Sequence, residues 1–196
     1  MSAPHRRDPS PARPPRAGDL LISSVAVDEG TFVGTVILII DHDESGTLGV
    51  ILNRYAEPRL ESVLPAWASL VSSPRVLFNG GPVSANGAIC LAALVDQEED
   101  PPGFRRVFDG VGLLHLDTPT EIVGGAYADL RIFAGYSGWD SGQLASEMSL
   151  GWWWVADTRY DDVFGDQPED LWRRVLRRQP SELAYFSTWV DDPELN

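Results

Sequence analysis

The sequence predicts an α+β fold built on a mixed, largely antiparallel β-sheet or barrel. Short runs rich in β-branched and aromatic residues occupy the first two-thirds of the chain, and the clearest helical pattern lies in the last third. Strands and helices do not alternate as they do in a parallel βαβ protein. The chain has 196 residues, 43% of them hydrophobic, which is enough for one domain with its own core.

The first seventeen residues differ from the rest and are predicted to form a disordered tail. They contain five prolines and four arginines and almost no apolar side chains. They also lack the apolar stretch of a secretory signal. We therefore expect a tail over residues 1–17 and a single domain over residues 18–196, in which residues 179–196 form an aromatic C-terminal extension packed on its surface.

The strands are expected to be joined by tight turns. Residues 31–41 and 47–53 are rich in β-branched side chains and flank a short polar turn, so they predict a hairpin. A second hairpin is predicted around Asp109 and Gly110, a pair typical of such turns. Further strands are expected at 19–23, 75–83, 87–95 and 129–135.

Short helices are predicted at residues 60–67 and 118–126, and a longer one at 167–180. Pro168 opens this last helix and Pro180 ends it. Its acidic residues come first and its four arginines last, which matches the helix dipole at both ends. Another helix is expected to follow Asp140, because Gln143 stands three places later in the pattern of a capping box.

The segment Gly-Tyr-Ser-Gly-Trp, residues 135–139, is expected to form a sharp joint between the strand at 129–135 and the helix after Asp140. The glycines allow an unusual backbone, and Trp139 is expected to wedge the joint. A strand then resumes at the three tryptophans 152–154, and its alternation should direct their rings to both faces of the sheet.

The charge and the cysteine content exclude several classes of protein. The net charge is −14 and every one of the fifteen basic residues is arginine. An acidic surface repels phosphate backbones, so direct nucleic-acid binding is not expected. Cys90 is the only cysteine, which rules out an intrachain disulfide and a cysteine-based zinc site. No apolar run reaches the roughly 18 residues of a membrane span, so we expect a soluble, cytoplasmic protein.

No set of catalytic residues is recognisable by its spacing. Ser137 stands between glycines as in a nucleophile elbow, but Trp139 occupies the place where the elbow needs its second glycine. His42 lies among carboxylates at a strand end, where it is either a charged turn residue or one ligand of a metal site that needs two more. Cys90 is expected to be an inert buried thiol. We therefore assign no catalytic residue, metal or cofactor.

Six residues at strand ends and bends are the candidate ligand-binding positions. The asparagine and the arginine have structural alternatives, a loop tie and an ion pair with a carboxylate. The two glycines form either a tight bend or an anion-binding nest of backbone amides. The candidates are Asn53, Arg54, Gly80, Gly81, Tyr136 and Trp139.

Five segments taken together resemble the YqgE/AlgH family, a group of uncharacterised bacterial proteins. The resemblance covers about residues 18–178, and its segments are GDLLIS, TFVGTVILIIDHDESGTLGVILNR, VLFNGGPV, RIFAGYSGWDSGQLASEMSLGWW and VFGDQPEDLWRRVL. It implies a mixed β-sheet partly closed into a barrel, with helices packed around it. The family pattern has alanine where Ser137 stands, which argues against a serine nucleophile here.

These observations favour a non-catalytic domain that binds a small ligand or a protein partner. One alternative is a hydrolase-type enzyme that uses His42 with a carboxylate or a metal. Another is a transcriptional regulator, as some members of the family are labelled. Because the chain is acidic and shows no helix-turn-helix or basic stripe, such regulation is not expected to involve direct DNA binding.

Overall fold

A computed structural model describes residues 13–188 of the chain. Nine strands form its framework: β1 Asp19–Ser23, β2 Val36–Asp43, β3 Gly46–Ile51, β4 Phe78–Asn79, β5 Val83–Leu94, β6 Phe104–Phe108, β7 Val111–Leu114, β8 Tyr127–Asp140 and β9 Trp153–Asp157. Six α-helices and two 3₁₀ turns join them: α1 Leu60–Val63, α2 Thr120–Val123, α3 Gln143–Ser149, α4 Tyr160–Phe164, η1 Pro168–Asp170, α5 Leu171–Arg177, α6 Ser181–Ala184 and η2 Tyr185–Thr188.

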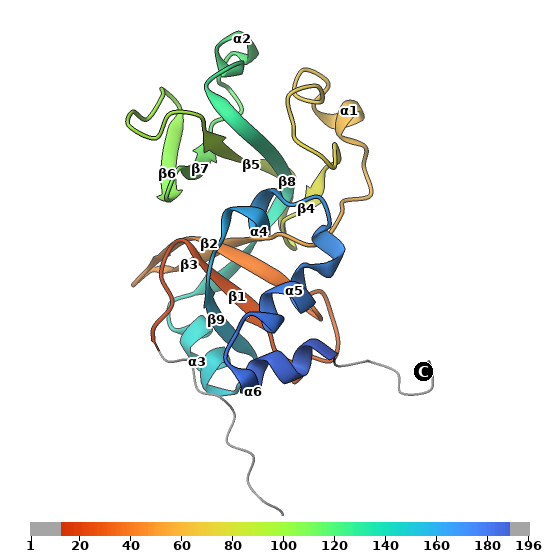
Figure 1. Cartoon of the computed structure of the whole chain (residues 1–196), viewed down its shortest axis with the longest axis vertical. Helices are drawn as coiled ribbons and strands as arrows, with labels where there is room; N and C mark the ends of the chain where they lie inside the picture. Colours follow the sequence, from red (N-terminus) through yellow and green to blue (C-terminus); the bar gives the residue numbers. More distant parts are fainter. Residues whose placement is uncertain (1–12, 189–196) are drawn as a thin grey trace, which may run out of the picture.

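The strands form one sheet in the order β6-β7-β5-β8-β3-β2-β1-β9, and β4 pairs with β8 beside this path. Every pairing is antiparallel except that of β4 with β8, which is parallel. The sheet curves into a half-barrel, with α3, α5 and α6 around its β1-β2-β9 end and α1 and α2 at the other end (Figure 1). The predicted fold class, a mixed and largely antiparallel sheet partly closed into a barrel, is therefore confirmed.

Both predicted hairpins are present. β2 and β3 pair from Ile37 opposite Ile51 to the polar turn, where the Asp43 carboxylate accepts a hydrogen bond from the Ser45 amide at 2.7 Å. β6 and β7 pair across the turn at Asp109, whose φ of +42° is the left-handed conformation that such turns use.

The predicted sharp joint at residues 135–139 is wrong, because Gly-Tyr-Ser-Gly-Trp lies inside the long strand β8. The first part of β8 pairs with β5 and its last residues pair with β3, so the strand exchanges one partner for another. Gly135 is at this crossing, with a φ of +66°, and a Cβ there would lie 2.6 Å from the Gly81 carbonyl oxygen. The glycine therefore permits a close crossing of backbones, and the sharp turn comes later, at Gly142.

Helix α3 begins later than the predicted cap at Asp140, and α5 is shorter than predicted. α3 begins at Gln143, and the Gln143 side-chain oxygen still accepts the Asp140 amide at 3.0 Å, as one half of a capping box would. The predicted helix at 167–180 is a 3₁₀ turn from Pro168 followed by α5, which ends at Arg177.

The two faces of the sheet carry separate apolar clusters. The inner cluster contains Leu20, Leu38 and Val175, so α5 covers the concave face. On the outer face, Trp153 packs with residues of β1, β2 and α3. Trp154, the next residue, points inward and stacks on Phe186 with ring centroids 5.2 Å apart. The rings of this tryptophan run do face both sides of the sheet, as predicted.

The described part of the chain begins within the segment assigned to a tail. Arg13 forms ion pairs with Asp19 and Asp157, and the Arg16 amide donates to Asp19 at 3.0 Å, so this segment contacts the start of β1 and the end of β9. Residues 1–12 and 189–196 lie outside the described residues. Among residues 13–188, no helix is long and apolar enough to cross a membrane.

Candidate functional site

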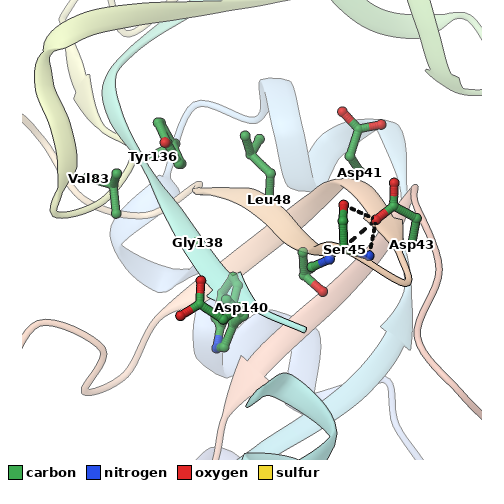
Figure 2. A pocket seen from close by; sticks show the side chains of 11 residues that line it. Asp41, Asp43, Ser45, Leu48, Val83, Tyr136, Gly138 and Asp140 are labelled. Atoms are coloured by element: carbon green, nitrogen blue, oxygen red, sulfur yellow. Dashed lines mark hydrogen bonds between the residues drawn. The ribbon is translucent and has the colours of Figure 1, made fainter. Parts of the chain in front are cut away.

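An open groove of about 490 Å³ lies where the last residues of β8 meet the β2–β3 hairpin (Figure 2). Figure 2 shows Asp41 and Asp43 on the hairpin side of the groove and Tyr136 and Val83 on the opposite side. Its lining consists of Asp41, Asp43, Ser45, Gly46, Thr47, Leu48, Val83, Tyr136, Gly138, Trp139 and Asp140. Below, this space is called the groove.

The three carboxylates of the groove have different environments. Asp41 forms a two-point ion pair with Arg105 of β6, at 2.8 and 2.7 Å. Asp43 accepts hydrogen bonds from the Ser45 hydroxyl and amide, which lower the pKa of its carboxyl group. Asp140 is exposed, and no ion pair holds it within the described residues. The groove therefore has a net negative charge.

A second hollow of about 320 Å³, here called the aromatic pocket, lies behind Trp139. The loop before β2, the end of β8, helix α3 and the start of β9 enclose it. Its lining consists of Ala26, Val27, Asp28, Glu29, Phe32, Gly138, Trp139, Gln143, Glu147, Trp152 and Trp153. Gly138 and Trp139 line both hollows, so one short stretch of β8 separates them.

Glu147 of α3 holds the aromatic pocket together. Its Oε2 atom accepts hydrogen bonds from the indole N–H groups of Trp139 at 2.8 Å and Trp153 at 2.7 Å. Its Oε1 atom accepts a hydrogen bond from the side-chain amide of Gln143 at 2.9 Å. Gln143 and Glu147 are one helical turn apart, so the helix places both on the same face. One carboxylate thus fixes two rings that come from different strands.

Of the six predicted positions, the structure places Tyr136 and Trp139 at these hollows. Gly80 and Gly81 lie behind the wall of the groove, where a Cβ would meet backbone oxygen atoms of β8 at 2.4 and 2.3 Å. Their amides are already used, since Gly80 donates to Ala134 and Gly81 to the Asn79 side chain. The two glycines permit close packing of backbones, and their amides are not available for an anion.

Asn53 and Arg54 lie at the other end of β3, away from both hollows. The Asn53 side chain accepts the Val36 amide at 2.9 Å and donates to the Gly34 carbonyl at 2.8 Å. The Arg54 guanidinium donates to the backbone carbonyls of Val33 and Asn53, and burial lowers its pKa. Both side chains tie down the loop before β2. The carboxylate pairing considered for Arg54 is absent from the described residues.

The residues considered for catalysis do not form a reactive group. The Ser137 hydroxyl is fully buried and donates to the Gly80 carbonyl at 3.1 Å. His42 is exposed, and its ring bonds the Thr47 hydroxyl at 2.7 Å. Burial raises the pKa of the Cys90 thiol to about 12. Among residues 13–188, no three His, Cys, Asp or Glu side chains are placed to hold a metal ion.

Sequence reasoning missed Phe32, Glu147 and Trp153 as parts of a site. Phe32 reaches the pocket from a loop more than one hundred residues away from Trp139, and no local pattern indicates that contact. The signal that was available is the spacing of Gln143 and Glu147, which places two polar side chains on one face of a helix next to two tryptophans.

A family model described as AlgH-like matches residues 20–184. Two bacterial relatives, each named UPF0301 protein, align over most of their length. The one from Streptomyces avermitilis is 44% identical over 182 residues, covering 91% of this chain and 94% of the relative. The one from Mycobacterium bovis BCG is 42% identical over 203 residues, covering 100% of both chains.

Two solved structures are similar. A crystal structure of a protein from Corynebacterium diphtheriae has a TM-score of 0.85 and 30% identity, covering 90% of this chain and 94% of that one. The solution structure of the AlgH protein from Pseudomonas aeruginosa has a TM-score of 0.67 and 22% identity, covering 89% and 94%. At that lower identity the second likeness supports the fold alone.

Proposed function

Since this chain belongs to the AlgH-like family, we propose that it is a non-catalytic domain that binds a small ligand, or a side chain of a protein partner, in the two hollows beside Trp139. The observation that carries the proposal is that the groove and the aromatic pocket have two lining residues in common. Gly138 and Trp139 line both the groove and the aromatic pocket, so hollows of about 490 and 320 Å³ lie on the two sides of one strand end. Volumes of this size are typical of small-ligand sites.

The chemistry around the hollows favours binding over catalysis. General acid–base or nucleophilic catalysis needs a reactive side chain within hydrogen-bond reach of an activating partner. In the groove, Asp41 pairs with Arg105, and Asp43 accepts hydrogen bonds from its own turn, so both carboxylates have structural partners. Neither hollow contains a histidine or a cysteine in its lining. The hydrolase alternative based on His42 therefore has less support.

Gly138 offers a direct test of this proposal. It lies in a strand and is exposed, and a Cβ there would meet the Tyr136 ring at 3.4 Å and the Val83 side chain at 3.9 Å, both ordinary contact distances. Gly138→Val should therefore fold normally, since β-branched residues suit strands. Its side chain enters the groove beside Tyr136 and Val83. The matched control is Gly124→Ala after α2, where an added Cβ has nothing within 4 Å.

The experiment is a ligand-detected NMR screen of neutral, cationic and anionic fragments against the wild type and both variants. Fragments that bind the wild type and Gly124→Ala, but lose at least about tenfold in affinity with Gly138→Val, support the proposal. Fragments that bind all three chains equally do not occupy the groove. A screen without hits in the wild type rejects a small-ligand site at this position.

A further inference from the structure

The aromatic pocket contains three rings in mutual contact. Phe32 stacks against Trp139 with centroids 6.1 Å apart and meets the edge of Trp153 at 5.6 Å. Trp139 and Trp153 lie nearly perpendicular, with centroids 5.7 Å apart. A fourth ring, Trp152, lines the pocket while 40% of its surface remains exposed to solvent. Aromatic rings, and tryptophan above all, attract cations through their electron-rich faces.

The charged residues of the aromatic pocket all have the same sign. Glu147 lies in its wall and Asp28 and Glu29 lie at its edge, while the lining contains no arginine or histidine. Within the described residues, none of these three carboxylates forms an ion pair. Glu147 is half-buried, and all of its hydrogen-bond donors are neutral. A buried or half-buried charge without a counterion favours a ligand that brings one.

The occupied lone pairs of Glu147 indicate which kind of cation fits. A carboxylate has about four acceptor positions, and three of those on Glu147 already accept from Trp139, Trp153 and Gln143. A guanidinium needs two parallel acceptors for its strong pairing, and a primary ammonium has three donors to satisfy. A quaternary ammonium has no N–H donor to satisfy and is weakly hydrated, so rings and a nearby charge are enough to hold it.

We propose that the aromatic pocket binds the quaternary ammonium group of a small molecule. The inference rests on the proposed function and names the ligand class for one of its two hollows. The pocket of about 320 Å³ is small, which suits a compact cation of this kind. The negative charge of the whole chain, −14, adds long-range attraction for such a ligand.

The test compares choline with its neutral isostere 3,3-dimethylbutan-1-ol, and with methylguanidinium, on the full chain by NMR titration. Wild type should bind choline at least about tenfold more tightly than the neutral compound and more tightly than methylguanidinium. Trp152→Leu removes the exposed ring and should weaken choline binding about fivefold without unfolding the chain. Tyr185→Leu, which removes an exposed ring on the α5–α6 side, is the matched control and should leave the affinity unchanged.

Four outcomes overturn this inference. They are no binding of choline, equal affinity for choline and the neutral isostere, tighter binding of methylguanidinium, and choline binding that substitutions at Trp152 and Glu147 leave unchanged. Glu147→Gln is the second variant, since it keeps a hydrogen-bond acceptor for the indoles but removes the charge. If neutral fragments bind in a way that Gly138→Val abolishes while choline does not bind, the ligand class is wrong and the proposed binding function stands.

Discussion

Arg131 is a buried cation whose removal should strongly destabilise the chain. Its side chain is only 2% exposed, and the guanidinium donates to the backbone carbonyls of Val163, Ser73 and Gly165, the last two at 3.0 Å. It also lies 4.5 Å above the centre of the Phe78 ring. These contacts join β8 to the loop before β4 and to the end of α4. Arg131→Met keeps much of the volume and removes every one of the bonds.

Two opposing terms set the magnitude. A hydrogen bond from a charged group contributes about 1.5–3 kcal/mol, so the loss of three such bonds costs roughly 4–9 kcal/mol. Burial without a carboxylate partner lowers the pKa of Arg131 to about 10, which corresponds to a desolvation cost of about 3 kcal/mol that methionine avoids. The carbonyl bonds outweigh this gain, and Arg131→Met should lower the free energy of unfolding by about 3 kcal/mol.

Urea denaturation followed by circular dichroism measures this loss. The slope m of the unfolding free energy against urea concentration should be the same in both chains, because the surface exposed on unfolding does not change. The matched control is Arg75→Met, an exposed arginine on the neighbouring loop, which should change stability by less than about 0.5 kcal/mol. An Arg131→Met chain as stable as the wild type, or more stable, would refute this reasoning. It would show that the desolvation cost cancels the three hydrogen bonds.

Three further predictions follow from other groups. Asn53→Ala leaves the Val36 amide and the Gly34 carbonyl without partners and should lower the free energy of unfolding by about 3 kcal/mol in urea, with a loss below about 1 kcal/mol as the contrary result. Burial and a hydrogen bond to Glu169 raise the pKa of Tyr55 to about 12. The folded chain therefore favours the neutral phenol. The contribution of Tyr55 to the free energy of unfolding is present below pH 10 and is lost as the pH rises through about 12. The difference in absorbance at 295 nm between wild type and Tyr55→Phe should titrate near pH 12, and a midpoint near 10 would contradict the assignment. The Cys90 thiol, buried and with its pKa raised to about 12, should react with Ellman's reagent only in denaturant; rapid labelling of the native chain would show that it is accessible.

The parts of the fold that depend on local chemistry were predictable. The two hairpins are marked by polar turns, and the turn residues alone select that geometry. The full length of β8 was not predictable, because Gly135 is explained by the carbonyl of Gly81, which comes from a distant segment. The sequence shows the glycine, but the backbone atom that leaves no room for a Cβ is brought close to it only by folding.

The candidate site was predictable in part for the same reason. Tyr136 and Trp139 are large rings beside glycines at a strand end, and the structure places both at a hollow. Asn53 has the same kind of position, but its partners are backbone groups of the preceding loop. Glu147 is one polar residue of a short helix, and its role becomes visible only when two indoles from different strands converge on its carboxylate.

The most direct test of a ligand site beside Trp139 is the response of the indole N–H signals in a ¹⁵N-labelled chain titrated with tetramethylammonium. The signals of Trp139 and Trp153, whose N–H groups both bond Glu147, should shift progressively and saturate together. The signal of Trp67, buried in the apolar cluster of α1, should stay in place. If the Trp139 and Trp153 signals do not move, or if Trp67 shifts as much as they do, the hollows beside Trp139 are not where the cation binds.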